Sequence, residues 1–175
     1  GKAVRRSFAK KRGLTALHLV TAWATENGLT LGQVACEEKS NEITAIPELL
    51  KLLDLKGQTV TIDAMGCQKE IAAQIRQQKG HYVLSLKGNQ GTLADDMEQF
   101  YEEAVDQKFA GVEHSTVDTF DRGHGREEFR SYDVLEIPED HPQRAVWKDL
   151  RSLVVVTSCR EVDGVRGLDV LVERR

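Results

Sequence analysis

Between residues 46 and 104 the sequence alternates between helical periodicity and short apolar runs, which limits the folds open to the chain. Residues 46–57, 68–80 and 92–104 show apolar positions at helical spacing, with polar residues on the opposite face. Between them, QTVTIDAM at 58–65 and HYVLSLKGN at 81–89 have the composition of short buried strands that end in loops. Strands separated by single helices are typical of parallel pairing through crossover connections. The pattern predicts an α/β fold whose sheet is flanked by helices.

Segments on both sides of this core predict antiparallel hairpins. Asn27-Gly28 separates two β-rich runs, and this dipeptide favours a tight two-residue turn. Residues 113–137 predict two polar strands about the turn sequence RGHG. Residues 150–175 predict two further strands about a turn at Asp163-Gly164. The leading hairpin must be antiparallel, so a mixed sheet within one domain over residues 1–175 is expected.

Composition excludes several classes of protein. The 175 residues, 40% of them hydrophobic, are enough for one globular domain with a core. No apolar run reaches the roughly 18 residues of a membrane span, and the first residues lack the apolar region of a secretory signal. A soluble, cytoplasmic protein without a membrane partner is therefore expected. Cys36, Cys67 and Cys159 lack the spacing of a zinc site or a disulfide framework, so we expect reduced thiols.

Positive charge is concentrated at the start of the chain. The net charge is −4, yet residues 1–12 contain six lysines and arginines and no acidic residue. One interpretation is a solvated arm. The other is contact with phosphate groups, which clustered Lys and Arg side chains bind.

The apolar run 59–62 leads directly into Asp63, and a carboxylate there must be solvated, paired or bound to a metal. Asp63 could cap the following helix by accepting backbone N–H bonds. It could also serve chemistry, because ligands collect at the carboxyl ends of parallel strands. Metal-dependent phosphoryl transfer needs several converging carboxylates. The other acidic pairs are more simply interpreted as solvated: Glu37 with Glu38, and Glu127 with Glu128.

Four motifs carry a resemblance to a known family. GKAVRRSF, TIDAMGCQ, LKGNQ and RGHGREE occur in this order at residues 1–8, 61–68, 86–90 and 122–128. In order and spacing they resemble the central part of the DDE-type insertion-sequence transposases that include the H-repeat-associated proteins. The resemblance spans essentially the whole chain, and it implies a central fragment of the catalytic domain of an enzyme of DNA transposition and recombination.

The resemblance implies a ribonuclease H-like fold in which two Asp and one Glu bind Mg²⁺ (or Mn²⁺) for DNA strand cleavage and transfer. Asp63 corresponds to the second Asp. The family's first Asp would immediately precede Gly1, and its Glu would follow the last predicted strand in a Trp-x-Ile-Glu-Asn motif, so this fragment alone is expected to be inactive. Residues 113–137 would be a β-hairpin insertion. Glu128 matches a family His-Gly-Arg-x-Glu pattern there, but a two-stranded insertion is a poor support for a metal ligand, and Glu128 is not assigned as one.

DNA, both the element ends and the target, is the implied partner, and homo-oligomerisation in the active complex is left open. Lys87, Asn89 and Gln90 would face DNA on the same edge as Asp63, where they could contact phosphate or a metal-bound water. Weaker candidates are His124 and Arg126, with Arg5 and Arg6 in the basic arm. Two alternatives remain: a non-catalytic remnant that at most binds nucleic acid through this arm, and a hydrolytic nuclease of the same fold.

Overall fold

The computed structural model describes residues 2–3, 18–36, 42–123, 126–162 and 165–174, with side chains described within 18–36, 42–122 and 127–160. It is a mixed α/β structure with helices and two sheets. The chain divides into two compact units. The first comprises residues 1–60 and 68–81, and the second comprises residues 61–67 and 82–175. Within the described residues, no helix has the length and apolar character needed to cross a membrane.

The first unit contains the leading hairpin. Strands β2 (His18–Ala24) and β3 (Leu29–Cys36) pair antiparallel, and the short β1 (Lys2–Ala3) pairs with β2 to give a three-stranded sheet. The hairpin predicted about Asn27-Gly28 is therefore confirmed. Its connection is longer than expected, since the turn covers residues 25–28. A two-residue turn of the Asn-Gly type needs positive φ at both central residues, and here only Gly28 has one, at 62°.

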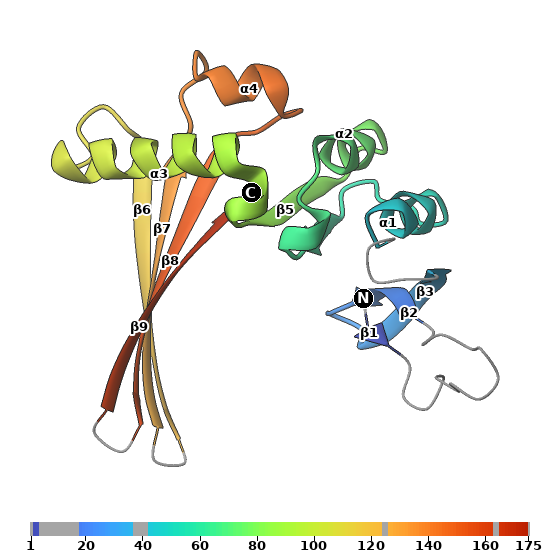
Figure 1. Ribbon diagram of the computed structural model, residues 1–175, viewed down its shortest axis with the longest axis horizontal. Helices are drawn as coiled ribbons and strands as arrows, with labels where there is room; N and C mark the ends of the chain where they lie inside the picture. Colours follow the sequence, from blue (N-terminus) through green and yellow to red (C-terminus); the bar gives the residue numbers. More distant parts are fainter. Residues whose placement is uncertain (1, 4–17, 37–41, 124–125, 163–164, 175) are drawn as a thin grey trace. The chain divides into compact units, whose positions relative to one another are not determined.

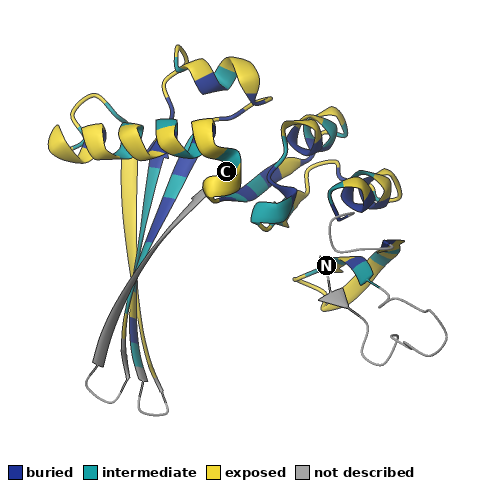
Figure 2. Cartoon of the chain, in the orientation of Figure 1, coloured by how far each residue is buried: buried dark blue, intermediate teal, exposed yellow. Residues whose placement is uncertain are grey.

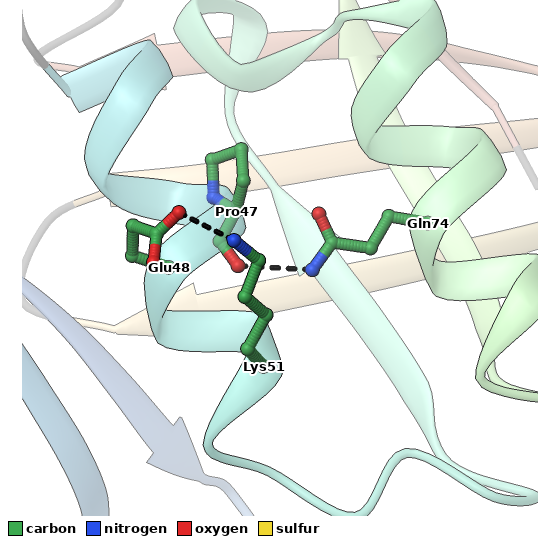
Figure 3. A network of polar contacts seen from close by, with 4 residues as sticks. All are labelled: Pro47, Glu48, Lys51 and Gln74. Atoms are coloured by element: carbon green, nitrogen blue, oxygen red, sulfur yellow. Dashed lines mark hydrogen bonds and ion pairs between the residues drawn. The ribbon is translucent and has the colours of Figure 1, made fainter.

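Helices α1 (Glu42–Lys51) and α2 (Lys69–Gln77) also belong to the first unit. The α2 stripe is buried as predicted, and it comprises Ile71, Ala72 and Ile75. Helix α1 begins four residues earlier than predicted and ends before Leu53, so Pro47 lies inside it instead of near its start. The two helices are joined by the Gln74 amide, whose Nε2 donates to the Pro47 carbonyl at 2.9 Å (Figure 3). Figure 3 also shows the exposed ion pair within α1, in which Lys51 Nζ lies 2.6 Å from Glu48 Oε1.

The second sheet has six strands in the order β4-β5-β9-β8-β7-β6. Their bounds are β4 Thr59–Ile62, β5 His81–Leu86, β6 His114–Gly123, β7 Arg126–Glu136, β8 Ser152–Val162 and β9 Val165–Arg174. The pairs from β5 through β9, β8 and β7 to β6 are all antiparallel. The predicted strands at 113–137 and 150–175 thus form hairpins.

One expectation about pairing was wrong. The leading hairpin lies in its own three-stranded sheet, separate from the sheet that contains β4 and β5. In the six-stranded sheet β9 pairs with β5, and β6 is the outer strand. Pairing between distant strands depends on cross-strand side-chain packing, which local periodicity does not encode.

The core of the second unit lies beneath helix α3 (Gly91–Asp106), which crosses the strands near one end (Figure 1). The helix buries Leu93, Met97 and Ala104, as its apolar spacing predicts. The same unit buries side chains of β7, β8 and the segment between them, which include Leu135, Ile137, Trp147, Leu150, Leu153 and Val155. That segment also contains the short helix α4 (Pro142–Val146), which was not predicted. Strand β6 is exposed along residues 114–122 (Figure 2), as an outer strand should be.

Candidate functional site

Asp63 lies directly after β4 and is exposed. It caps the 3-10 turn η3 (Ala64–Gly66), because its Oδ1 accepts a hydrogen bond from the Met65 backbone N–H at 3.2 Å. The turn is closed by Gly66 N, which donates to Asp63 O at 3.0 Å. The capping interpretation is therefore confirmed for this turn. It does not extend to α2, whose N-cap residue Gln68 makes no side-chain capping bond.

The loop after β5 contacts the loop that contains Asp63. Lys87 precedes a second 3-10 turn, η4 (Gly88–Gln90), and is exposed. Asn89 Nδ2 donates to the Ala64 carbonyl at 2.7 Å. Gln90 Nε2 donates to the Cys67 carbonyl at 2.8 Å. The structure thus brings the TIDAMGC and LKGNQ segments together, as expected for loops that follow neighbouring strands of one sheet.

The two amides have a role that the sequence did not reveal. Asn89 and Gln90 donate to backbone carbonyls across the gap between two loops. Polar residues directly after a strand could have suggested hydrogen bonds between neighbouring loops, but nothing in the sequence identifies the acceptor carbonyls. Their assignment to DNA, and that of Lys87, stays a prediction. Of the other DNA-contact candidates, Arg5, Arg6 and His124 lie outside the described residues, and only the backbone of Arg126, in β7, is described.

Glu128 is not solvated, contrary to the expectation for the Glu127-Glu128 pair. It is 7% exposed, and its Oε1 lies 2.5 Å from Arg130 Nη2 and 3.6 Å from Arg160 Nη2. Arg160 is its cross-strand partner on β8, so the register itself places a guanidinium beside the carboxylate. A buried carboxylate needs such pairing to offset its lost hydration. The arginines make Glu128 unsuited to a cation, in agreement with leaving it out of the metal-ligand set.

The other acidic candidates do not supply a second metal ligand among the described residues. Glu127 is half-exposed and pairs with Arg122 at 3.0 Å, while Glu37 and Glu38 lie outside the described residues. Across the part of the chain that the structure describes, no three His, Cys, Asp or Glu side chains gather closely enough to hold a metal ion. Mg²⁺ requires six oxygen ligands in near-octahedral geometry, although several of them are usually waters. Asp63 supplies one carboxylate, so the described residues do not form a metal centre by themselves.

Comparison with known proteins defines the class. Residues 1–153 match the family model described as the transposase DDE domain. The chain therefore belongs to the DDE transposase family, and the resemblance seen in its four motifs is confirmed.

Individual relatives share this assignment in part. "Putative transposase YncI" of Escherichia coli O157:H7 is 47% identical over 162 residues, which cover 92% of this chain and 41% of the relative. "H repeat-associated putative transposase YhhI" of Escherichia coli (strain K12) is 42% identical over 163 residues, covering 93% and 42%. "Uncharacterized protein in dhlA 3'region" of Xanthobacter autotrophicus is 44% identical over 175 residues, covering 100% and 56%. The chain thus spans about half the length of the curated relatives it matches. No solved structure matches it.

Proposed function

We propose that this chain is part of the catalytic domain of a DNA transposase, that the domain has a ribonuclease H-like fold, and that Asp63 is one of its acidic metal ligands. The intact protein would cut and join DNA strands by metal-dependent phosphoryl transfer. The observation that carries this proposal is the position of Asp63. In this member of the DDE transposase family, the exposed carboxylate of Asp63 lies at the end of β4. The turn that contains Asp63 is hydrogen-bonded to the loop that follows the neighbouring strand β5.

The proposed ion is Mg²⁺ or Mn²⁺. In two-metal sites such ions activate the attacking oxygen and stabilise the leaving oxygen during an in-line displacement. Because the described residues hold no group of three possible metal ligands, we propose that the other ligands come from elsewhere in the intact protein. Asp63 Oδ1 accepts a hydrogen bond from the Met65 N–H at 3.2 Å, which restricts the orientation of the carboxylate.

The proposed substrate is DNA, and the edge that contains Asp63 is the proposed contact. Lys87 is exposed and lies next in sequence to the turn whose Asn89 and Gln90 side chains bond to the Asp63 loop. Its ammonium group would contact a DNA phosphate as a point charge. Arg5, Arg6, His124 and Arg126 are proposed as further contacts on the strength of their charge and of the motifs that contain them.

The test compares Asp63→Asn with Asp54→Asn in the intact protein, incubated with supercoiled DNA and Mn²⁺. Asp54 is a matched control because it is also exposed and its Oδ1 accepts a backbone N–H two residues on, from Lys56, at 3.2 Å. We expect Asp63→Asn to abolish nicking and Asp54→Asn to leave it unchanged. Equal activities in the two variants would contradict the proposal.

The products decide between the alternatives. Strand joining identifies a transposase, whereas hydrolysed ends without joined products identify a nuclease. An intact protein that only binds DNA would be a remnant, and its affinity should then fall steeply with salt and with Arg5→Gln and Arg6→Gln.

A further inference from the structure

The turn that contains Asp63 has few bonds of its own. Residues 64–66 form a single 3-10 turn, closed by Gly66 N to Asp63 O at 3.0 Å and by Cys67 N to Ala64 O at 3.3 Å. Short 3-10 turns have poorer hydrogen-bond geometry than an α-helix and are weak in isolation. Asp63 itself is exposed, while Cys67 is fully buried. Only one end of the turn is therefore held by the core.

Two side-chain amides bracket this turn from a second loop. Asn89 donates to the carbonyl of Ala64, the residue next to Asp63, and Gln90 donates to the carbonyl of Cys67, directly after the turn. Both donors come from consecutive residues of η4, whose own closing bond runs from Gln90 N to Lys87 O at 3.0 Å. The acceptors and donors are 25 and 23 residues apart in sequence. We call this pair of bonds the amide brace.

We propose that Asn89 and Gln90 are positioning residues, which hold the Asp63 turn in the shape that directs its carboxylate. This inference rests on the proposed metal-binding role of Asp63. It differs from the expected direct contact of Asn89 and Gln90 with phosphate, because here each amide acts through the hydrogen bond that it donates to a backbone carbonyl. A displacement of about 1 Å in a reacting group can lower a rate by about a hundredfold, so bracing an exposed turn has a catalytic consequence.

The test uses uncharged substitutions that remove the donors, Asn89→Ala and Gln90→Met, singly and together in the intact protein. Gln33→Met is the matched control, since Gln33 is an exposed glutamine whose Nε2 donates to Thr21 Oγ1 at 3.1 Å in the other unit. None of these changes alters the net charge, which keeps non-specific attraction to DNA constant.

The first readout is amide hydrogen exchange without metal or DNA. The Met65, Gly66 and Cys67 amides all donate within the turn, so they report on its opening. We expect them to exchange about tenfold faster in the double variant and at the parent rate in Gln33→Met, since a lost hydrogen bond favours local opening by about this factor. Unchanged exchange would show that the amides do not brace the turn.

The second readout separates positioning from DNA contact. Loss of positioning should lower kcat for nicking about tenfold or more and raise the Mn²⁺ concentration for half-maximal activity, while KM for DNA stays within about twofold. A rise in KM with unchanged kcat would show that the amides contact DNA, and it would overturn the inference.

The two proposals can fail separately. If Asp63→Asn is inactive and the double variant keeps the parent kcat despite faster exchange, the brace has no catalytic role and the proposed function stands. If Asp63→Asn keeps full activity, the metal role fails, and the positioning inference fails with it.

Discussion

A carboxylate in the second unit joins three elements of the fold. Asp133 of β7 accepts a hydrogen bond from the Tyr101 hydroxyl of α3 at 2.8 Å and one from Thr116 Oγ1 of β6 at 2.6 Å. Burial, followed by the hydrogen bond to Asp133 and the negative charge of that carboxylate, raises the pKa of Tyr101 to about 12. We expect Tyr101→Phe to loosen the attachment of α3 to the sheet.

The magnitude follows from the environment of the bond. A hydrogen bond to a charged group contributes about 1.5–3 kcal/mol to stability, and less where water can replace the lost donor. Tyr101 is only partly buried, and Thr116 still donates to Asp133 in the variant. The expected loss in Tyr101→Phe is therefore at the lower end of that range or below it, about 1 kcal/mol in the free energy of unfolding.

The assay is chemical denaturation followed by tryptophan fluorescence. The chain has two tryptophans: Trp147 in the second unit is 2% exposed, whereas Trp23 in the first unit is 58% exposed. In a Trp23→Phe background, Trp147 reports on unfolding around α3 and the sheet. Tyr132→Phe is the control, since Tyr132 neighbours Asp133 and its hydroxyl has no hydrogen-bond partner among the described residues. Removing a hydroxyl that has no hydrogen-bond partner should change the free energy of unfolding by less than the loss expected for Tyr101→Phe.

The pH dependence gives an independent check. The folded-state pKa of Tyr101 is raised above its unfolded value, so its contribution is fully present below pH 10 and is lost as pH rises toward about 12. The stability difference between the parent and Tyr101→Phe should therefore be constant up to about pH 9 and then shrink. Equal losses in Tyr101→Phe and Tyr132→Phe, or a difference that persists above pH 12, would refute the reasoning.

Substitutions at four further positions test the packing and the cap by denaturation without metal. Asp63→Ala should cost about 1 kcal/mol and Asp63→Asn almost nothing, because Asn accepts the Met65 N–H about as well; equal losses would contradict the cap. Gly80→Ala should cost about 1–3 kcal/mol, since its Cβ would lie 3.0 Å from the Leu55 carbonyl oxygen; Gly91→Ala meets no atom within 4 Å and should be neutral or stabilising. Met97→Ala removes a side chain with 0% exposure and should cost about 2–5 kcal/mol, and a smaller loss would mean that the core collapses around the gap.

Local sequence patterns predicted the presence of the helices more accurately than the residues at which they begin and end. The α2 stripe was identified because its apolar spacing and the polar residues on its opposite face agree. The sequence predicts a helix that starts at residue 46, with Pro47 in its first turn, yet α1 begins at Glu42 and accommodates Pro47 in its interior. Proline removes one helical hydrogen bond, and here the apolar packing of the α1 face outweighs that loss.

Long-range pairing was not predictable. Nothing local indicates that β9 should pair with β5, or that Arg160 should lie opposite Glu128. Such partners are chosen by side chains that are far apart in sequence. For the same reason the sequence identified Asp63, Asn89 and Gln90 as polar residues at strand ends but could not show that the two amides bind the backbone around Asp63.

Capping and metal binding are compatible roles for Asp63. Capping occupies one carboxylate oxygen, Oδ1, and it holds the group at the exposed end of β4. A cap alone explains only the bond to Met65, and it gives no reason for two further amides to reach the same turn from another loop. Ordering an amide side chain costs up to about 2 kcal/mol of entropy, which an exposed hydrogen bond barely offsets. The proposed ligand role would supply a reason for rigidity at that cost, because a ligand carboxylate must point in one direction.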